Sequence, residues 1–315
     1  MPGRSWYTAI SGGSPVKEAK NVAASVRQRL LNLSKAENRP FTEVLQYYGM
    51  ERFLYRLSQS RYADRFILKG ALMLRVWQSP QHRPTMDIDL LGHAENSPEK
   101  IEAQVREILA VEVDSDGVLF YPETISSEEI TQEAEYSGVR VFFRGTLDTA
   151  RINFQLDIGF GDSVYPAPRK SSFPTLLEHP APSMFCYSRE SAIAEKLEAM
   201  VKHGYLNSRM KDFFDIWLLS RQFSFEGPVL AEALSRTFKQ RGTTVSADLP
   251  VTEDRFITEK QIQWSAFRRR MKLEYIPASF EQIAQVVLDF LIPVVTALSH
   301  ESLFSMQWTP AHGWQ

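Results

Sequence analysis

Asp87 and Asp89 are separated by one residue within an apolar run that extends to residue 91. Because side chains alternate between the two faces of a strand, both carboxylates point the same way while Ile88 points into the core. Two adjacent carboxylates repel each other unless a cation lies between them. Mg2+ or Mn2+ prefers oxygen ligands of this kind and commonly keeps phosphate oxygens in its shell. Asp87 and Asp89 are therefore candidate metal ligands, although surface strands also carry such acidic pairs without a metal.

A Lys-Gly turn precedes the acidic pair. The apolar run at residues 66–68 ends at Lys69, and Gly70 and Ala71 follow. Because Gly70 has no Cβ, backbone N–H groups there can approach a phosphate closely, and a helix predicted over residues 71–77 would direct its positive end toward it. A strand, a glycine turn, a helix and an acidic strand in this order indicate a site for nucleotide phosphates and a metal.

A third carboxylate, Asp157, belongs to a later strand. Residues 151–158 alternate between polar and apolar side chains, which predicts a strand with one buried face and places Asp157 on its polar face. This strand can lie beside that of Asp87 and Asp89. Asp162, which follows the strand, is typical of a turn.

Further charged residues lie in a helix pair predicted later in the chain. Lys196, Arg209 and Lys211 are cations, and a nucleoside triphosphate needs cations. Asp212 and Asp215 are three residues apart and so share one helix face. The alternative is a solvated helix face with weak ion pairs, formed by Glu195, Lys196, Glu198 and Lys202.

Hydrophobic periodicity predicts helices on both sides of a block of strands. Helices are predicted at residues 16–33 and 42–58, and Asn96, Ser97 and Pro98 are typical of a helix start. Strands are predicted at residues 118–121, 138–143 and 151–158, with a hairpin connection at 145–149. A Pro-rich connector at 165–182 precedes helices predicted at 188–203, 210–221, 228–240, 258–272 and 278–298.

The chain has 315 residues, a formal net charge of -2 and one cysteine, Cys186. This length allows one large domain or two smaller ones. The small net charge excludes a strongly basic polyanion binder, so any contact with nucleic acid requires a local patch. A single cysteine excludes an internal disulfide and a cysteine-based zinc cluster, and we expect Cys186 to be a small buried side chain.

Membrane and export signals are not evident in the sequence. Residues 1–15 lack the apolar segment of a secretory signal, and the longest apolar run, at 283–298, is interrupted by Gln285, Asp289 and Pro293. The sequence therefore predicts a cytoplasmic protein that does not span a membrane.

Four segments together resemble the AbiEii group of the nucleotidyltransferase superfamily, which are toxins of type IV toxin–antitoxin and abortive-infection systems. These segments are residues 66–75, 83–90, 156–162, and 195–199 with 209–216. The resemblance implies an α+β fold, with a polymerase-beta-like mixed sheet, flanking helices and a helical C-terminal region. It divides the chain into a helical region (1–60), a catalytic core (61–165) and a mainly helical domain that completes the active site (166–315).

The same resemblance implies the activity and the roles of the site residues. The reaction would move a nucleoside monophosphate from an NTP to an acceptor, with Mg2+ or Mn2+ and release of pyrophosphate. The metal ligands would be Asp87, Asp89 and Asp157, and the catalytic residues would be these three with Lys196 and Asp212. The nucleotide-binding residues would be Lys69, Gly70, Ala71, Thr85, Arg209, Lys211 and Asp215. Ala71 departs from the family, which usually has a glycine or serine there, so no hydroxyl is available to a phosphate.

The acceptor implied by the resemblance is the 3′ end of tRNA, and a cognate antitoxin would be encoded nearby. In part of the family a Ser or Thr two residues before the acidic pair is phosphorylated, and Thr85 has this position. A phosphate there would add negative charge beside Asp87 and Asp89. The alternative is that Thr85 only starts the strand.

Basic and aromatic side chains are interleaved near the C-terminal end of the predicted helix at 258–272. Such a pattern suits an RNA backbone and its bases, but also an amphipathic helix with a charged outer face. The residues are Trp264, Phe267, Arg268, Arg269, Arg270 and Lys272. Two other functions stay open, namely transfer to a protein or small molecule, and a non-catalytic binding module.

Overall fold

The computed structural model describes residues 16–80, 83–93, 97–132, 136–247, 249–272 and 274–315. Residues 1–15 and Asn96, named above in the expectations on export and on a helix start, lie outside this range. The helices are α1 (Val16–Ala36), α2 (Phe41–Gln59), α3 (Met73–Val76), α4 (Pro98–Leu109), α5 (Arg189–His203), α6 (Met210–Gln222), α7 (Gly227–Gln240), α8 (Asp254–Met271) and α9 (Phe280–Ser299). The strands are β1 (Phe66–Lys69), β2 (Ile88–Gly92), β3 (Val118–Gln132), β4 (Tyr136–Leu147), β5 (Ala150–Phe160), β6 (Arg169–Ser172), β7 (Ser183–Cys186), β8 (Phe225–Glu226), β9 (Gln307–Thr309) and β10 (Gly313–Trp314).

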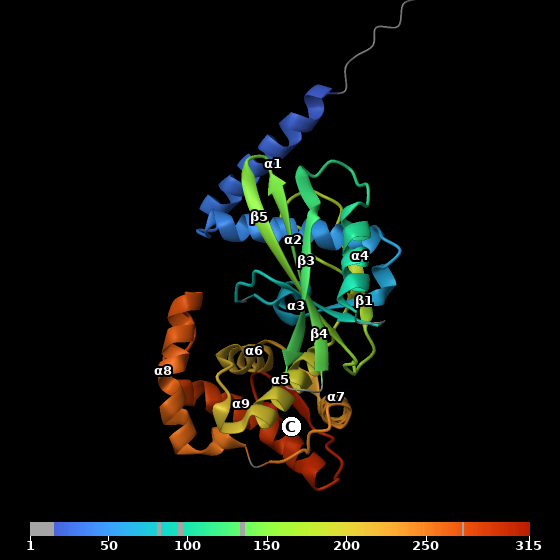
Figure 1. The fold of residues 1–315 in the computed structure, drawn as a ribbon. Coiled ribbons are helices and arrows are strands. Elements are labelled where there is room, and N and C mark those ends of the chain that lie inside the picture. Colours follow the sequence, from blue (N-terminus) through green and yellow to red (C-terminus); the bar gives the residue numbers. More distant parts are fainter. Residues whose placement is uncertain (1–15, 81–82, 94–96, 133–135, 248, 273) are drawn as a thin grey trace, which may run out of the picture.

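The helices and long strands occupy different parts of the molecule. Helices α1 and α2 lie at one end, α5 to α9 lie at the other, and β3 to β5 extend between them (Figure 1). The helices predicted from hydrophobic periodicity are confirmed within a few residues at their ends. Helix α4 begins as expected, because Pro98 occupies its first turn and the Ser97 hydroxyl accepts a hydrogen bond from the Lys100 backbone N–H.

The main sheet is mixed, which confirms the predicted α+β class. Its strand order is β3-β4-β5-β2-β1-β7-β6, in which β2 runs parallel to β5 and antiparallel to β1. The alternation predicted for residues 151–158 is confirmed, since Ile152, Phe154, Leu156 and Ile158 are buried. The predicted neighbourhood of this strand and the acidic strand is confirmed by the β2–β5 pairing. The sheet therefore places Asp89 and Asp157 on adjacent strands, and Asp87 immediately precedes β2.

The predicted hairpin connection is confirmed but is shorter than expected, and the predicted connector is wrong in part. Strand β4 continues to Leu147 and pairs it with Ala150, so only two residues form the turn expected at 145–149. One of them, Asp148, has a positive φ of 53°, which aspartate tolerates in tight turns. The expected connector at 165–182 contains β6, which pairs with β7 at the sheet edge. Because β6 is mostly exposed, it carries no alternating hydrophobic pattern that could reveal a strand.

The buried apolar side chains form two cores. The first lies between the main sheet and helices α1, α2 and α4, and it ends along the chain at Tyr187. Cys186 is buried in it, as expected. The second core is built mainly by α5 to α9 and includes Leu74 from α3. We therefore propose a domain boundary near Tyr187, with α1 and α2 as part of the sheet domain.

Helix α9 is central to the second core. By length and composition alone it is apolar enough to cross a membrane, with a mean hydropathy of 1.7. Its side chains at Phe280, Ile283, Val287 and Phe290 are buried against the other helices, so it packs as a core helix. Pro293 lies inside the helix without ending it.

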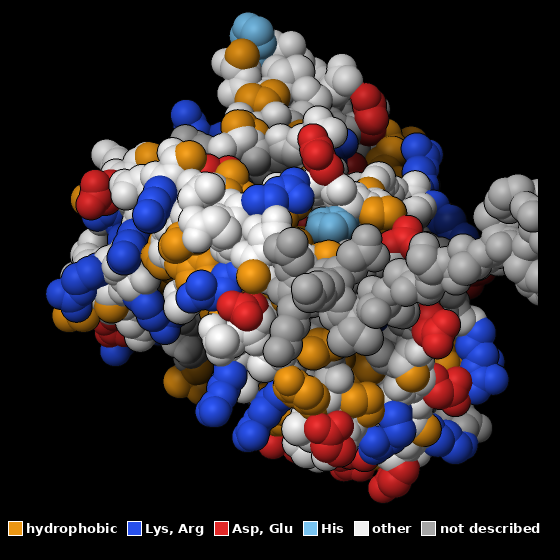
Figure 2. All heavy atoms as spheres, turned by 90° about the horizontal axis from the view of Figure 1, so that it is seen from above, with side chains coloured by type: hydrophobic (Ala, Val, Ile, Leu, Met, Phe, Trp, Pro, Cys, Tyr) orange, Lys and Arg blue, Asp and Glu red, His pale blue; other side chains and the backbone are white. Residues whose placement is uncertain are grey.

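The face of the molecule seen from above carries charges of both signs (Figure 2). Figure 2 shows the molecule from above, and Lys and Arg side chains occur there together with Asp and Glu side chains and scattered apolar ones. Neither sign covers this face alone, which agrees with the small net charge of the chain. A concentration of charge is found instead inside a cleft.

Candidate active site

A cleft of about 680 Å³ is lined by residues of β1, β2, β4 and β5 together with residues of α5 and α6. All the predicted site residues except Ala71 and Thr85, which are buried, line it. The lining residues among them are Lys69, Gly70, Asp87, Asp89, Asp157, Lys196, Arg209, Lys211, Asp212 and Asp215. Tertiary folding thus brings together positions that are up to 146 residues apart, from Lys69 to Asp215.

A row of charged residues crosses five neighbouring strands of the main sheet. In the strand pairing Lys69 is opposite Asp89, Asp89 is opposite Asp157, and Asp157 is opposite Arg140. Arg140 is in turn opposite Glu128 on β3. Because residues opposite one another point to the same face, their charges lie side by side, and two acidic residues are adjacent at its centre.

Asp87, Asp89 and Asp157 form the one cluster among the described residues with the composition of a metal site. One oxygen of each lies within 4.8 Å of those of the other two. Burial and the neighbouring charge of Asp87 raise the pKa of Asp89 to about 6, because ionised Asp89 is poorly compensated by the protein. Three carboxylate oxygens so close together, two of them from residues without a basic partner among the described residues, fit a hard divalent cation such as Mg2+ or Mn2+.

Gly70 shapes this cluster directly. Its φ is +71°, and a Cβ built on it would lie 1.8 Å from Oδ2 of Asp89. The following residues form a 3-10 turn, Gly70–Leu72, and then the short helix α3, in place of one continuous helix. The glycine is therefore needed both for the turn and for the close approach of Asp89.

Thr85 and Arg140 each hold a carboxylate of the triad in place. The Thr85 hydroxyl donates a hydrogen bond to Oδ1 of Asp87, and its backbone N–H donates to the Tyr47 hydroxyl. On the other side, Arg140 donates to both oxygens of Asp157, from Nε at 2.7 Å and from Nη2 at 2.8 Å. Asp157 is thus the one member of the triad that has an arginine partner among the described residues.

The predicted cations and carboxylates of α5 and α6 form a buried ion network. Lys196 lies between Asp212, at 3.1 Å, and Asp215, at 2.8 Å. Arg209 pairs with Asp212 at 2.6 Å, and Arg83 holds Asp215 through two hydrogen bonds. Burial alone would raise the pKa of Asp215, but Arg83 and Lys196 outweigh burial and lower it to about 2. The alternative of a solvated helix face is wrong for these residues, because both aspartates are buried.

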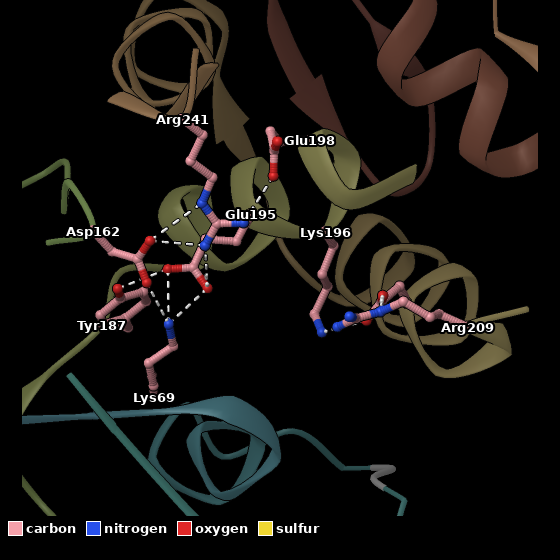
Figure 3. Close-up of polar contacts among 9 residues, drawn as sticks. Lys69, Asp162, Tyr187, Glu195, Lys196, Glu198, Arg209 and Arg241 are labelled. Carbon is pink, nitrogen blue, oxygen red and sulfur yellow. Dashed lines mark hydrogen bonds and ion pairs between the residues drawn. The ribbon is translucent and has the colours of Figure 1, made fainter. Parts of the chain in front are cut away.

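A second ion network joins the sheet to the helices. Lys69 reaches from β1 toward Asp162 and Glu195, and Arg241 binds Asp162 and Glu198 (Figure 3). Burial would lower the pKa of Lys69, but Glu195 and Asp162 outweigh it and the pKa is raised well above its usual value. Asp162 therefore forms ion pairs in addition to following the strand as expected. Glu198 is buried on Arg241, so its assignment to a solvated face is wrong.

The remaining predictions concern Lys211 and the basic segment of α8. Lys211 is exposed at the cleft and forms no ion pair with another described residue. On α8, Trp264 and Phe267 are buried in the second core, so they are not available to stack on bases. That half of the RNA prediction is wrong, whereas Arg269, Arg270 and Lys272 are exposed.

Several cleft residues were not predicted from the sequence. Arg140 could have been found, since it is the one charged residue in the apolar strand pattern at 138–143. Arg83 precedes the acidic pair within a segment that carries the family resemblance, but nothing there indicates a partner on α6. Glu195 and Arg241 acquire their roles through contacts between distant segments, for which no local signal exists.

Comparisons with known proteins identify the family of the chain. A family model described as nucleotidyl transferase AbiEii toxin, type IV TA system, matches residues 52–286. Among solved structures, a candidate nucleotidyltransferase from H. pylori has a TM-score of 0.44 and 14% identity, over 79% of this chain and 92% of that chain. The protein JHP933 from Helicobacter pylori has a TM-score of 0.42 and 13% identity, over 91% of this chain and 94% of its own. No curated protein matches the chain.

Proposed function

Because the chain belongs to the AbiEii family of nucleotidyltransferase toxins of type IV toxin–antitoxin systems, we propose that it transfers a nucleoside monophosphate from an NTP to the 3′ end of tRNA in a metal-dependent reaction. The observation that supports this most directly is the triad of Asp87, Asp89 and Asp157, whose oxygens lie together in a large cleft. A growth-inhibiting toxin of this kind works where NTPs and tRNA are found, so we expect it in the cytoplasm.

The residues of the chain divide between the metal and the phosphates. Asp87, Asp89 and Asp157 would hold Mg2+ or Mn2+, which when bound stabilises charge on the attacking and leaving oxygens. Lys211 lines the cleft and forms no ion pair with another described residue. It would therefore bind the triphosphate without first releasing a carboxylate. Lys196 and Lys69 are already paired with carboxylates, so each would have to share its charge with a phosphate.

The two sides of the cleft would orient the reactants. Asp212 and Asp215 keep Lys196 fully charged, because they raise its pKa despite burial, which alone would lower it. Arg209 is only partly buried on Asp212 and would contact a phosphate from the cleft side. The backbone of Gly70 lies beside Asp89, where N–H groups would be close to both metal and phosphate.

A direct assay tests the activity. Purified protein is incubated with total tRNA, Mg2+ and each labelled NTP in turn, and label is sought in the RNA. Transfer to the 3′ end requires the terminal hydroxyls, so tRNA oxidised with periodate should take up no label. Omission of the metal, or Asp89→Asn, should also abolish the label.

The same assay separates the other functions. If the label appears on a protein or a small molecule while the tRNA stays unlabelled, the proposed acceptor is wrong, but the protein is still a nucleotidyltransferase. Absence of transfer to every acceptor, together with NTP binding, would favour a non-catalytic binding module.

The family also implies an antitoxin partner. We propose Thr85 as a point of control, because its hydroxyl contacts Asp87 and a phosphate on it would place negative charge at the triad. Thr85 is buried, so a modifying enzyme would require this segment to open. Thr85→Glu should abolish transfer and Thr85→Val should retain most of it. Full activity of the Glu variant would argue against control at this residue.

A further inference from the structure

The Asp157 carboxylate is held more completely than the other carboxylates of the triad. Arg140 lies directly opposite on β4 and donates Nε to Oδ1 and Nη2 to Oδ2. Gln155, on the same strand as Asp157, donates a third hydrogen bond to Oδ1 at 3.1 Å. Glu128 approaches the other side of the Arg140 guanidinium at 3.5 Å.

These bonds leave the two oxygens of Asp157 unequal. A carboxylate offers about four acceptor positions, two on each oxygen. Arg140 and Gln155 occupy both positions on Oδ1, whereas Oδ2 accepts from Arg140 alone among the described residues. Oδ2 therefore retains one open position. A carboxylate held by a planar fork also cannot rotate without breaking two charge-assisted hydrogen bonds.

We propose that Arg140 is a positioning residue that locks the Asp157 carboxylate so that Oδ2 is the oxygen offered to the catalytic cation or to the acceptor hydroxyl. The proposal rests on the proposed function, because it assigns a task within the same metal site. It differs from a simple stabilising role. The side chain of Arg140 is 31% exposed and that of Asp157 is 20% exposed, so neither is a deeply buried charge that folding must neutralise.

The position of Arg140 has a second consequence for metal binding. Its positive charge lies beside the triad and opposes the approach of another cation. Removal of this charge should therefore strengthen metal binding, even as it releases Asp157 from its fixed orientation. Affinity for the metal and turnover are expected to change in opposite directions.

Lysine at this position separates charge from geometry. Lys keeps the positive charge but offers no planar fork, so it cannot hold both oxygens of one carboxylate in the same way. Arg140→Lys should therefore bind metal like the wild type and still turn over slowly. Arg140→Gln removes both charge and fork.

The experiment measures Mn2+ binding by electron paramagnetic resonance without NTP, transfer kinetics with saturating Mg2+, and thermal unfolding. For Arg140→Gln we expect Mn2+ to bind about threefold to tenfold more tightly, and kcat to fall by about 10- to 100-fold. For Arg140→Lys we expect Mn2+ affinity within about twofold of wild type and a fall in kcat of about tenfold or more. Arg144→Gln is the matched control, since Arg144 lies on the same strand and face but is opposite Asn153. It should leave both quantities unchanged.

Three results would overturn the proposal. These are unchanged kcat in Arg140→Gln, full recovery of kcat in Arg140→Lys, and weaker Mn2+ binding accompanied by a lower unfolding temperature, as a merely structural role requires. A rise in the KM for NTP alone, at constant kcat, would instead make Arg140 a substrate-binding residue and would likewise overturn it.

A double variant separates this proposal from the proposed function. If Arg140 acts through Asp157, Arg140→Lys, which keeps the charge but loses the planar fork, should alter the line shape of the bound Mn2+ resonance in the wild-type background and leave it unchanged in an Asp157→Asn background. This comparison needs no transfer activity. An equal change in both backgrounds would refute the coupling, whereas absence of tRNA labelling by the wild type would refute only the proposed reaction.

Discussion

Asp87 and Asp89 form no ion pair with another described residue, although the other acidic side chains in the row and in the two ion networks do. The Thr85 hydroxyl is the hydrogen-bond partner of Asp87, and Asp89 lies against the backbone of Gly70. Uncompensated charge costs folding free energy, which a bound divalent cation would offset. At the scale of single residues, Asp87 and Asp89 therefore mark the metal site, because their carboxylates have no basic partner among the described residues.

The first prediction concerns this pair. Asp89→Asn removes a carboxylate ligand and should lower transfer by at least about a thousandfold, because several kcal/mol of charge stabilisation is lost with the metal. The unfolding temperature without metal should equal or exceed that of the wild type, since burial and Asp87 disfavour the ionised form of Asp89. Transfer near the wild-type rate would exclude Asp89 as a ligand.

The second prediction separates Lys196 from its surroundings. Lys196→Met and Arg83→Met each leave the buried Asp215 with one cation fewer, and each should cost about 3 kcal/mol of stability. Only Lys196 also contacts Asp212 on the cleft side, so its loss should lower kcat by at least about a hundredfold. Arg83→Met should lower kcat much less.

Chemical denaturation and transfer kinetics on both variants provide the measurement. Equal losses of kcat at equal losses of stability would mean that Lys196 acts only through the ion network.

At the scale of elements, the turn after β1 and the pairing of β2 with β5 set the positions of the carboxylates. Gly70 permits the positive φ at the turn, and its missing Cβ makes room for Asp89 on β2. The parallel register then places Asp157 opposite Asp89. A shift of one residue in that register would send Asp157 to the other face of the sheet.

The third prediction tests the turn. Gly70→Ala should cost more than the roughly 1 kcal/mol expected for alanine at positive φ, because its Cβ would also displace the Asp89 carboxylate, and transfer should be lost. Gly313→Ala is the control, with a φ of +76° and only an ordinary contact at 3.7 Å. The control should lose about 1 kcal/mol and no activity, as measured by denaturation and tRNA labelling. Equal effects of the two substitutions would contradict the close approach of Asp89.

At the scale of the whole molecule, the two ion networks connect the two cores. Lys69 and Asp162 belong to the sheet side, and Glu195 and Arg241 belong to the helical side. Arg83, just before β2, binds Asp215 on α6 in the same way. The cleft is thus enclosed by side chains that also hold its two walls together.

The fourth prediction follows from the pKa of Asp215, which is lowered from 3.8 to about 2 in the folded protein. Since the folded pKa is below the unfolded value, the stabilisation is present above about pH 4 and is lost as pH falls toward 2. The difference corresponds to about 2 kcal/mol. Asp215→Asn should be less stable at pH 7 and should show a flatter loss of stability between pH 5 and pH 2. Parallel curves for variant and wild type would show that Asp215 does not contribute to this acid sensitivity.

The sequence alone determined the elements and the chemistry that depend on local patterns. The alternation at residues 151–158 located β5 and the face of Asp157, and helical periodicity located α1, α2 and the C-terminal helices. The Asp-x-Asp spacing placed Asp87 and Asp89 on one side. Such inferences succeed because strand and helix periods are properties of the local backbone.

Only the tertiary structure decided which charges meet. Lys69 pairs with Glu195 across 126 residues of sequence, and Arg83 pairs with Asp215 across 132. The exposed edge strand β6 and the burial of Trp264 also depend on what packs beside them, and no local pattern reveals this. Arg140 meets Asp157 because β4 and β5 pair in one particular register. That register is set by contacts between residues far apart in the sequence, so the local spacing around Arg140 or Asp157 does not reveal it.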